Sequence, residues 1–115
     1  MSYYTHYGIK MYPVQDIARE TEIMRAIAAK IYEEDPSDIS DNAAIWCLSD
    51  SMGWYDHEED MLEISKQFPE IIFVLYGEGE AHDDLWRKYF ANGEYEETYA
   101  KIIYPDPQNP KFKDL

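Results

Sequence analysis

Cysteine and long apolar runs are almost missing from this chain of 115 residues. Cys47 is the single cysteine, which excludes an internal disulfide, and the longest apolar run, residues 71–76 (IIFVLY), is far too short to span a bilayer. The first residues, MSYYTHYGIK, have neither the basic start nor the apolar stretch of a secretory signal. These absences predict a soluble, intracellular protein of the cytoplasm.

Basic residues are the second shortage. The chain has 24 Asp and Glu against 10 Lys and Arg, a formal net charge of -14. Nucleic acids and anionic lipid headgroups repel such a chain, so we expect neither as a direct partner and expect basic proteins instead. The imbalance is regional, because residues 31–65 hold eleven acids and no Lys or Arg.

Motifs for catalysis or metal binding are also missing. His57 is followed by three acids but lacks the second histidine one helical turn later that a zincin site needs. Residues 77–84 (GEGEAHDD) fit neither the EF-hand spacing nor a dinucleotide-binding glycine loop, and Cys47 lies in an apolar segment that favours an inert, buried thiol. The sequence therefore predicts no enzymatic activity, no metal and no cofactor.

The hydrophobic pattern predicts a single domain over residues 1–104 and an irregular tail over residues 105–115. Apolar spacing indicates strands at 3–12, 43–49 and 71–76 and helices at 14–34 and 56–68. The second helix is expected to begin with a capping box of Asp56 and Glu59.

Asn92-Gly93 predicts a tight hairpin that pairs Phe90 with Tyr95, Lys88 with Glu97, Trp86 with Tyr99 and Asp84 with Lys101. We expect an α+β fold of the ferredoxin-like kind, with two helices on one face of a mostly antiparallel sheet and a C-terminal hairpin.

Three segments carry a resemblance to a known family: residues 54–61 (WYDHEEDM), 68–80 (FPEIIFVLYGEGE) and 84–93 (DLWRKYFANG). Together they resemble small acidic proteins of phages and mobile elements that are related to the YubB-type ferredoxin-like domain. The resemblance covers about half of the chain and rests on aromatic and structural positions. It implies the fold, and it implies a place among anti-CRISPR or anti-restriction inhibitors.

The acidic segments are the candidate partner-binding site. Carboxylates spread over several elements can imitate the backbone of duplex DNA, which carries one negative charge per ~1.7 Å, and can so occupy a basic groove built for phosphates. The predicted function is a non-enzymatic inhibitor of a host defence protein, a CRISPR effector or a restriction enzyme, in the infected or host bacterial cell. The residues predicted to bind the partner are Glu33, Glu34, Asp35, Asp38, Asp41, Asp56, Glu58, Glu59, Asp60, Glu63, Glu78, Glu80, Asp83 and Asp84.

Two alternatives stay open. The acids can be a solvated face that serves only solubility, as most charge runs are. In that case an accessory or immunity-like protein would bind its partner through sheet aromatics, for which Tyr and Trp are suited as interface anchors. The residues of that alternative are Trp86, Tyr89, Phe90, Tyr95 and Tyr99.

Overall fold

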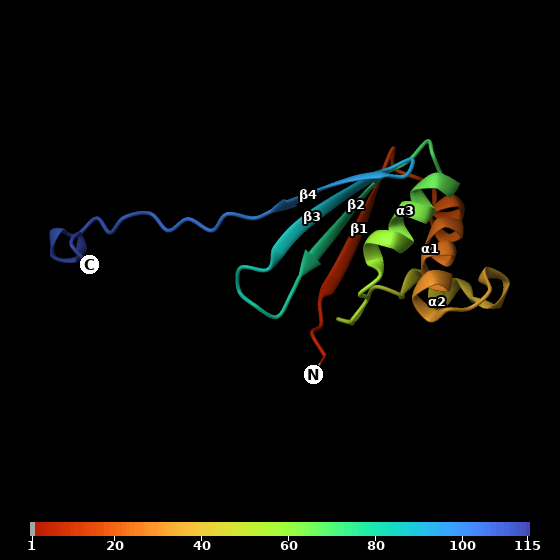
Figure 1. The fold of residues 1–115 in the computed structure, drawn as a ribbon, viewed down its shortest axis with the longest axis horizontal. Helices are drawn as coiled ribbons and strands as arrows, with labels where there is room; N and C mark the ends of the chain where they lie inside the picture. The colour runs from red at the N-terminus through yellow and green to blue at the C-terminus, as the bar shows by residue number, and fades with distance from the viewer. Residues whose placement is uncertain (1) are drawn as a thin grey trace.

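A computed structural model describes residues 2–115 (Figure 1). Its strands form a four-stranded, fully antiparallel sheet in the order β1-β2-β3-β4. The elements are β1 (His6–Tyr12), α1 (Ile17–Tyr32), η1 (Pro36–Asp38), α2 (Asp41–Ile45), α3 (His57–Gln67), β2 (Ile72–Glu78), β3 (Leu85–Ala91), β4 (Glu94–Tyr99) and η2 (Pro110–Phe112). The protein is thus α+β, with helices packed against the sheet.

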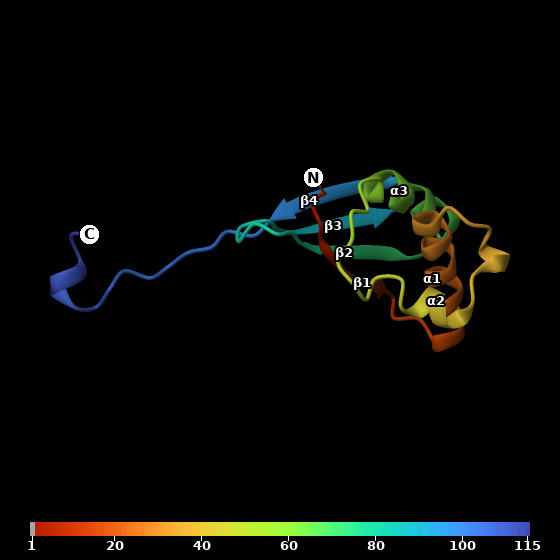
Figure 2. The same cartoon turned by 90° about the horizontal axis from the view of Figure 1, so that it is seen from below.

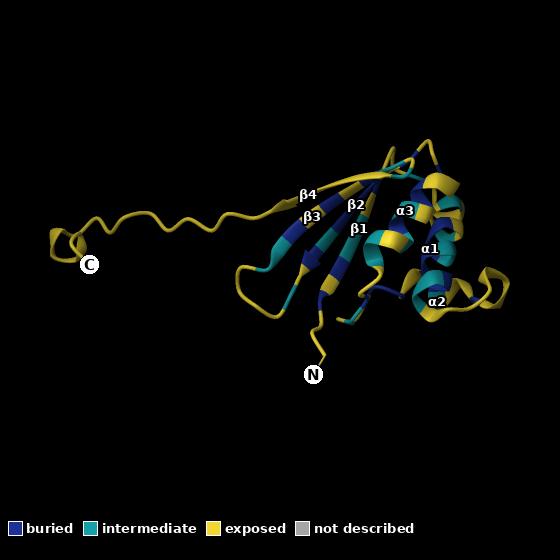
Figure 3. Ribbon diagram, viewed as in Figure 1, coloured by how far each residue is buried: buried dark blue, intermediate teal, exposed yellow. Residues whose placement is uncertain are grey.

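The helices gather on one side of the sheet and leave the other side bare (Figures 1 and 2). Alternate strand residues point to the helices because side chains in a strand alternate between its two faces. The core they form with α1 and α3 is almost fully shielded from water, as the dark segments of Figure 3 show. Its largest fully buried apolar side chains are Phe73, Phe90, Ile23, Ile27, Met61, Ile64, Ile71 and Leu75.

The longest helix begins and ends with recognisable signals. The Asp16 carboxylate accepts a hydrogen bond from the backbone N–H of Arg19, which caps the start of α1. Glu33 ends the helix in the left-handed conformation (φ 55°), and its N–H donates to the Ala29 carbonyl. The periodicity of residues 14–34 therefore predicted this element correctly.

The hairpin is also confirmed. Asn92 and Gly93 both have positive φ, as the tight turn requires, and the pairs Phe90 with Tyr95, Lys88 with Glu97, and Trp86 with Tyr99 form as expected. The fourth expected pair, Asp84 with Lys101, does not form, because β3 begins at Leu85 and β4 ends at Tyr99. After Tyr99 only the N–H of Ala100 still bonds to the sheet, to the Leu85 carbonyl (2.8 Å).

The expected strand at residues 43–49 is wrong. These residues begin within α2, whose start is capped by Ser40, since its hydroxyl accepts from the N–H of Ala43. The apolar run favours a strand, but Ser40 followed by Asp41, Asn42 and two alanines is a helix-start signal. The chain therefore passes from β1 to β2 through three α-helices and the short 3-10 helix η1.

The ferredoxin-like arrangement is not confirmed. Its strands would not follow one another in chain order, whereas here the order is a simple meander. β1 and β2 pair directly along their whole length, from His6 opposite Glu78 to Tyr12 opposite Ile72. The loss of the strand expected at 43–49 removes the element that the other topology needed.

Candidate functional site

The candidate acids fall on three segments that lie along one edge of the folded body. Residues 33–41 follow α1, residues 56–63 cover the start and first turns of α3, and residues 78–84 join β2 to β3. Figure 1 shows the three along the lower edge of the molecule, with the β2–β3 connection at one end and residues 33–41 at the other. In Figure 2 the start of α3 lies on the upper side of the body, between the β2–β3 connection at one end and residues 33–41 at the other.

Three of these acids are neutralised by bases within the chain. Asp41 pairs with Arg25, Glu63 with Lys30, and Glu58 with Lys88. The bases come from α1 and β3, beneath the acidic edge. The pair with Lys30 lowers the pKa of Glu63. These pairs subtract from the negative field that the edge could offer a partner.

Four further acids are held by hydrogen bonds without a neutralising charge. Asp35 accepts from the N–H and hydroxyl of Ser37, which lowers its pKa. Asp60 accepts from the indole N–H of Trp54 (2.8 Å). Glu80 accepts from the Tyr4 N–H and Asp84 from the Tyr3 hydroxyl, so these two carboxylates fix the N-terminal segment to the β2–β3 connection.

The remaining candidate acids have no side-chain hydrogen bond or salt bridge to other residues of the 2–115 range. All of them are exposed: Glu33, Glu34, Asp38, Asp56, Glu59, Glu78 and Asp83. The capping box expected for Asp56 and Glu59 is wrong, because the Asp56 side chain makes no capping bond and its backbone (φ -90°, ψ 19°) is not extended. The Asp56 carboxylate therefore stays in water with the others.

A buried lysine was missed by the sequence reasoning. Lys88 points from β3 toward α3 and is only 5% exposed. Its ammonium donates to Nε2 of His57 (2.7 Å) and lies 3.5 Å from Glu58, 3.7 Å from Glu97 and over the Trp86 ring. Strand alternation puts Lys88 on the same face as Trp86 and Phe90, and this was the available signal.

His57 is neutral in this cluster. Its Nδ1 lies 2.9 Å from the Trp54 carbonyl, which can only accept, so Nδ1 carries the proton and Nε2 accepts from Lys88. Burial, followed by the charge of Lys88, lowers the pKa of His57 below its ordinary value of 6.5. The WYDHEED segment thus joins α3 to the sheet, and its histidine has no free nitrogen to hold a metal.

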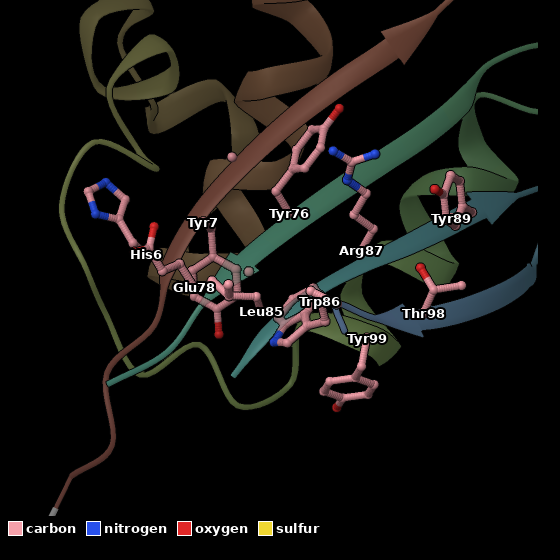
Figure 4. A pocket seen from close by; sticks show the side chains of 13 residues that line it. His6, Tyr7, Tyr76, Glu78, Leu85, Trp86, Arg87, Tyr89, Thr98 and Tyr99 are labelled. Carbon is pink, nitrogen blue, oxygen red and sulfur yellow. The ribbon is translucent and has the colours of Figure 1, made fainter. Parts of the chain in front are cut away.

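The bare face of the sheet is the second candidate surface. Tyr76 lies there between two cations, with Lys10 at 5.6 Å and Arg87 at 5.0 Å from its ring centre. Tyr76 and Arg87 line a hollow of about 680 Å³. Figure 4 shows the Tyr76 ring and the Arg87 guanidinium next to each other. Tyr89 projects from the same face and is 36% exposed.

The aromatic residues of the alternative hypothesis do not form one surface. Trp86 and Phe90 are buried under the helices, while Tyr89 lies on the opposite face of the sheet. Tyr95 and Tyr99 share the helix-covered face with Trp86 but lie on the edge strand, where both are exposed. The aromatic platform expected from the sequence is therefore split between the core, the edge and the bare face.

Cys47, the single cysteine of the chain, is buried. Burial raises the pKa of the Cys47 thiol to about 11, which keeps it protonated. Across residues 2–115, no group of three or more His, Cys, Asp or Glu side chains is placed to hold a metal ion. Over the same range, no helix combines the length and the apolar character needed to cross a bilayer.

In comparisons with protein-family models, with curated proteins and with solved structures, no match to this chain was found.

Proposed function

We propose that this protein is a non-enzymatic inhibitor that binds the basic nucleic-acid-binding surface of a host defence protein by presenting carboxylates in place of phosphates. The observation that carries the proposal is the set of free, exposed acids drawn from three segments, two of which lie in residues 31–65, a stretch without Lys or Arg. A basic groove that binds a polyanion by its charge would also attract this edge.

The free acids are those that the bases of the chain do not pair with. Arg25 and Lys30 each pair with one candidate acid and Lys88 pairs with Glu58 and Glu97, so within residues 2–115 the outer carboxylates are left without a counterion. Concentrating like charges costs stability, which a chain selected only for solubility could avoid by interspersing both signs. An exposed polyanionic edge is what a charge-driven encounter with a basic partner requires.

The target class follows from the same chemistry and from the family resemblance. CRISPR effectors and restriction enzymes hold nucleic acid in positively charged channels. Such a partner places the inhibitor in the cytoplasm of a bacterial cell. The attraction would fall with salt, because exposed charges are screened beyond a Debye length of about 10 Å at 0.1 M.

The test reverses four free acids on the edge: Glu34→Lys, Asp38→Lys, Glu59→Lys and Asp83→Lys. A matched control makes the same change of net charge away from the edge: Glu20→Lys, Glu96→Lys, Asp106→Lys and Asp114→Lys. Both are assayed for binding to, and inhibition of, a panel of purified CRISPR effectors and restriction enzymes, with duplex DNA as competitor. We expect the edge variant to lose about 100-fold or more in affinity and the control less than about tenfold, because position matters beyond total charge.

Equal losses in the two variants would show that only total charge matters, and unchanged binding by the edge variant would reject the proposal. A protein that inhibits without competing with DNA would also contradict it. Circular dichroism of both variants confirms that the fold is kept.

A second candidate is an accessory protein that binds a partner through the bare face of the sheet. The observation in its favour is Tyr76, held between Lys10 and Arg87 beside the hollow of Figure 4. Under this alternative, Arg87→Ala and Tyr89→Ala abolish partner binding while the four edge reversals leave it intact. Trp86 is unsuitable for this test because it is part of the core.

A further inference from the structure

β4 is an edge strand, and no strand of residues 2–115 pairs with its outer side. It pairs with β3 only, and all six of its residues are exposed. Edge strands present a row of unpaired N–H and C=O groups, which makes them templates for another strand. β4 is therefore open to pairing along its whole length.

The hairpin geometry shows which backbone groups point outward. In an antiparallel pair, residues that bond to the neighbouring strand alternate with residues that do not. Across the two-residue turn, Ala91 and Glu94 are the first bonded pair, and the Ala100 N–H bonds to the Leu85 carbonyl, so the even-numbered residues of β4 face β3. The N–H and C=O groups of Tyr95, Glu97 and Tyr99 consequently face outward.

The chain beyond β4 supplies the partner for this edge. Residues 100–115 are exposed throughout, and Figure 1 shows the segment continuing outward from the end of β4, away from the body. Ile102, Ile103 and Tyr104 are strand-forming apolar residues that are 48%, 82% and 85% exposed. A lone copy leaves these side chains in water.

We propose that β4 and residues 100–104 pair in antiparallel fashion with the same segment of a second copy, around a twofold axis at Tyr99. The outward-facing residues are odd-numbered. They lie opposite one another only in registers where the numbers of two paired residues add up to an even number. With Tyr99 opposite its own copy, Glu97 lies opposite Lys101 and Tyr95 opposite Ile103, each twice by symmetry. The two sheets then join into one.

Charge favours this register over its neighbours, because an axis at Thr98 would place Glu97 opposite Tyr99 and leave it without a second cation. A shift centred on Glu97 places like charges opposite each other, and a shift centred on Ala100 places Glu97 opposite Ile103 and Tyr95 opposite Pro105, which has no N–H. With the axis at Tyr99, Pro105 lies opposite Gly93, which is outside β4 because β4 begins at Glu94. Its missing N–H therefore costs no hydrogen bond between the two strands. Lys101 then supplies a second cation to Glu97, whose present partner Lys88 is 3.7 Å away.

This dimer is independent of the proposed inhibitor function, because none of the candidate edge acids lies on β4 or in the tail. The two associations also respond to salt in opposite ways. Two copies of net charge -14 repel each other, so screening favours the dimer, whereas screening weakens the attraction between the acidic edge and a basic partner.

A pair of proline variants tests the pairing. Ile103→Pro removes an N–H that donates to the second copy, whereas Ile102→Pro removes an N–H that faces away from it. Both residues lie outside the strands and are exposed, so the monomer fold is kept. By sedimentation equilibrium of the full chain, we expect a wild-type dimer, a dissociation constant raised roughly tenfold or more in Ile103→Pro since two hydrogen bonds are lost, and a smaller change in Ile102→Pro.

A chain that stays monomeric up to millimolar concentration at low and high salt would overturn the proposal. Equal effects of the two prolines would also overturn it, because they would show that the edge is not the interface.

Cross-linking tests the register. In Tyr99→Cys the two introduced thiols face each other about 5.5 Å apart between Cα atoms, within disulfide range. On treatment with diamide we expect a covalent dimer from Tyr99→Cys, little from Thr98→Cys, and none from the wild type, whose Cys47 is buried. Cross-linking that is equal at the two positions would reject the axis at Tyr99.

Discussion

Glu58 and Glu59 are adjacent on α3 and belong to two different environments. Glu58 points inward, lies 3.5 Å from Lys88 and has a side chain that is 37% exposed. Glu59 is exposed and has no partner within residues 2–115. Although partial burial works against it, the Tyr95 hydroxyl and Lys88 lower the pKa of Glu58, while Glu59 is surrounded by water.

The difference separates structural acids from acids that are free to bind. Glu58 and Glu97 compensate a lysine that would otherwise be buried as an unpaired charge. Glu59 pairs with no base in the described part of the chain, and it is exposed like the other free acids. Acidity in one heptapeptide, WYDHEED, therefore serves two purposes, and substitutions should separate them.

Removing the inner cation should have the largest effect on stability. Lys88→Ala leaves Glu58 and Glu97 as near neighbours without compensation and removes the donor to Nε2 of His57. We expect the free energy of unfolding to fall by about 2 kcal/mol, less than for a fully buried pair because both acids are partly exposed. Urea unfolding at neutral pH measures the loss.

Lys66→Ala is the matched control. Lys66 is exposed, lies in the last turn of α3 and has no salt bridge within residues 2–115, so its loss should change the free energy of unfolding by less than about 0.5 kcal/mol. If the two alanine variants were equally stable, Lys88 would not be the residue that holds α3 to β3.

An intermediate effect is expected from protonation of His57. Burial and Lys88 lower its pKa in the folded state, while Glu58 and Asp60 act in the opposite direction. Because the unfolded chain binds the proton first, the free energy of unfolding should decrease as the pH falls below 6.5 and continue to decrease until the folded-state pKa is passed. Urea titrations between pH 7.5 and about 5 follow this decrease.

His57→Gln should flatten the profile in this window, since glutamine can accept from Lys88 without gaining a proton. Exposed His6 and His82 remain in both proteins and serve as an internal control. A wild-type profile without slope above pH 5, or an equal slope in the glutamine variant, would contradict the assignment of His57. The loss from protonation of Glu58 comes separately, below its ordinary pKa of 4.5.

Local signals account for what could be predicted from the sequence. Asn92-Gly93 dictates its turn, and the apolar stripes of α1 and α3 repeat within a few residues, so all three elements were found. The pairing of β1 with β2 joins residues 60 to 72 positions apart, and no local pattern encodes it. The α+β class was therefore predicted correctly, whereas the strand order, on which the ferredoxin-like topology depends, could not be predicted from local patterns.

The candidate site shows the same division. Charge runs identified the acidic segments, but which acids are free depends on three bases from other elements, Arg25, Lys30 and Lys88. Lys88 was the hardest to foresee, because a lysine between aromatic strand residues is normally expected in water. Its burial depends on His57 and Glu58, which come from a helix some thirty residues earlier.

The smallest effect on stability should come from the outer acids. The edge variant with Glu34, Asp38, Glu59 and Asp83 changed to Lys removes no hydrogen bond or salt bridge within residues 2–115, so each change should matter by less than about 0.5 kcal/mol. At low salt the variant should be slightly more stable than the wild type, because repulsion along the edge is relieved, and this gain should vanish as salt screens it. Urea unfolding at low and high salt measures both. A loss above about 2 kcal/mol would place these acids with Glu58 as structural groups, and the edge would then no longer be free to imitate phosphates.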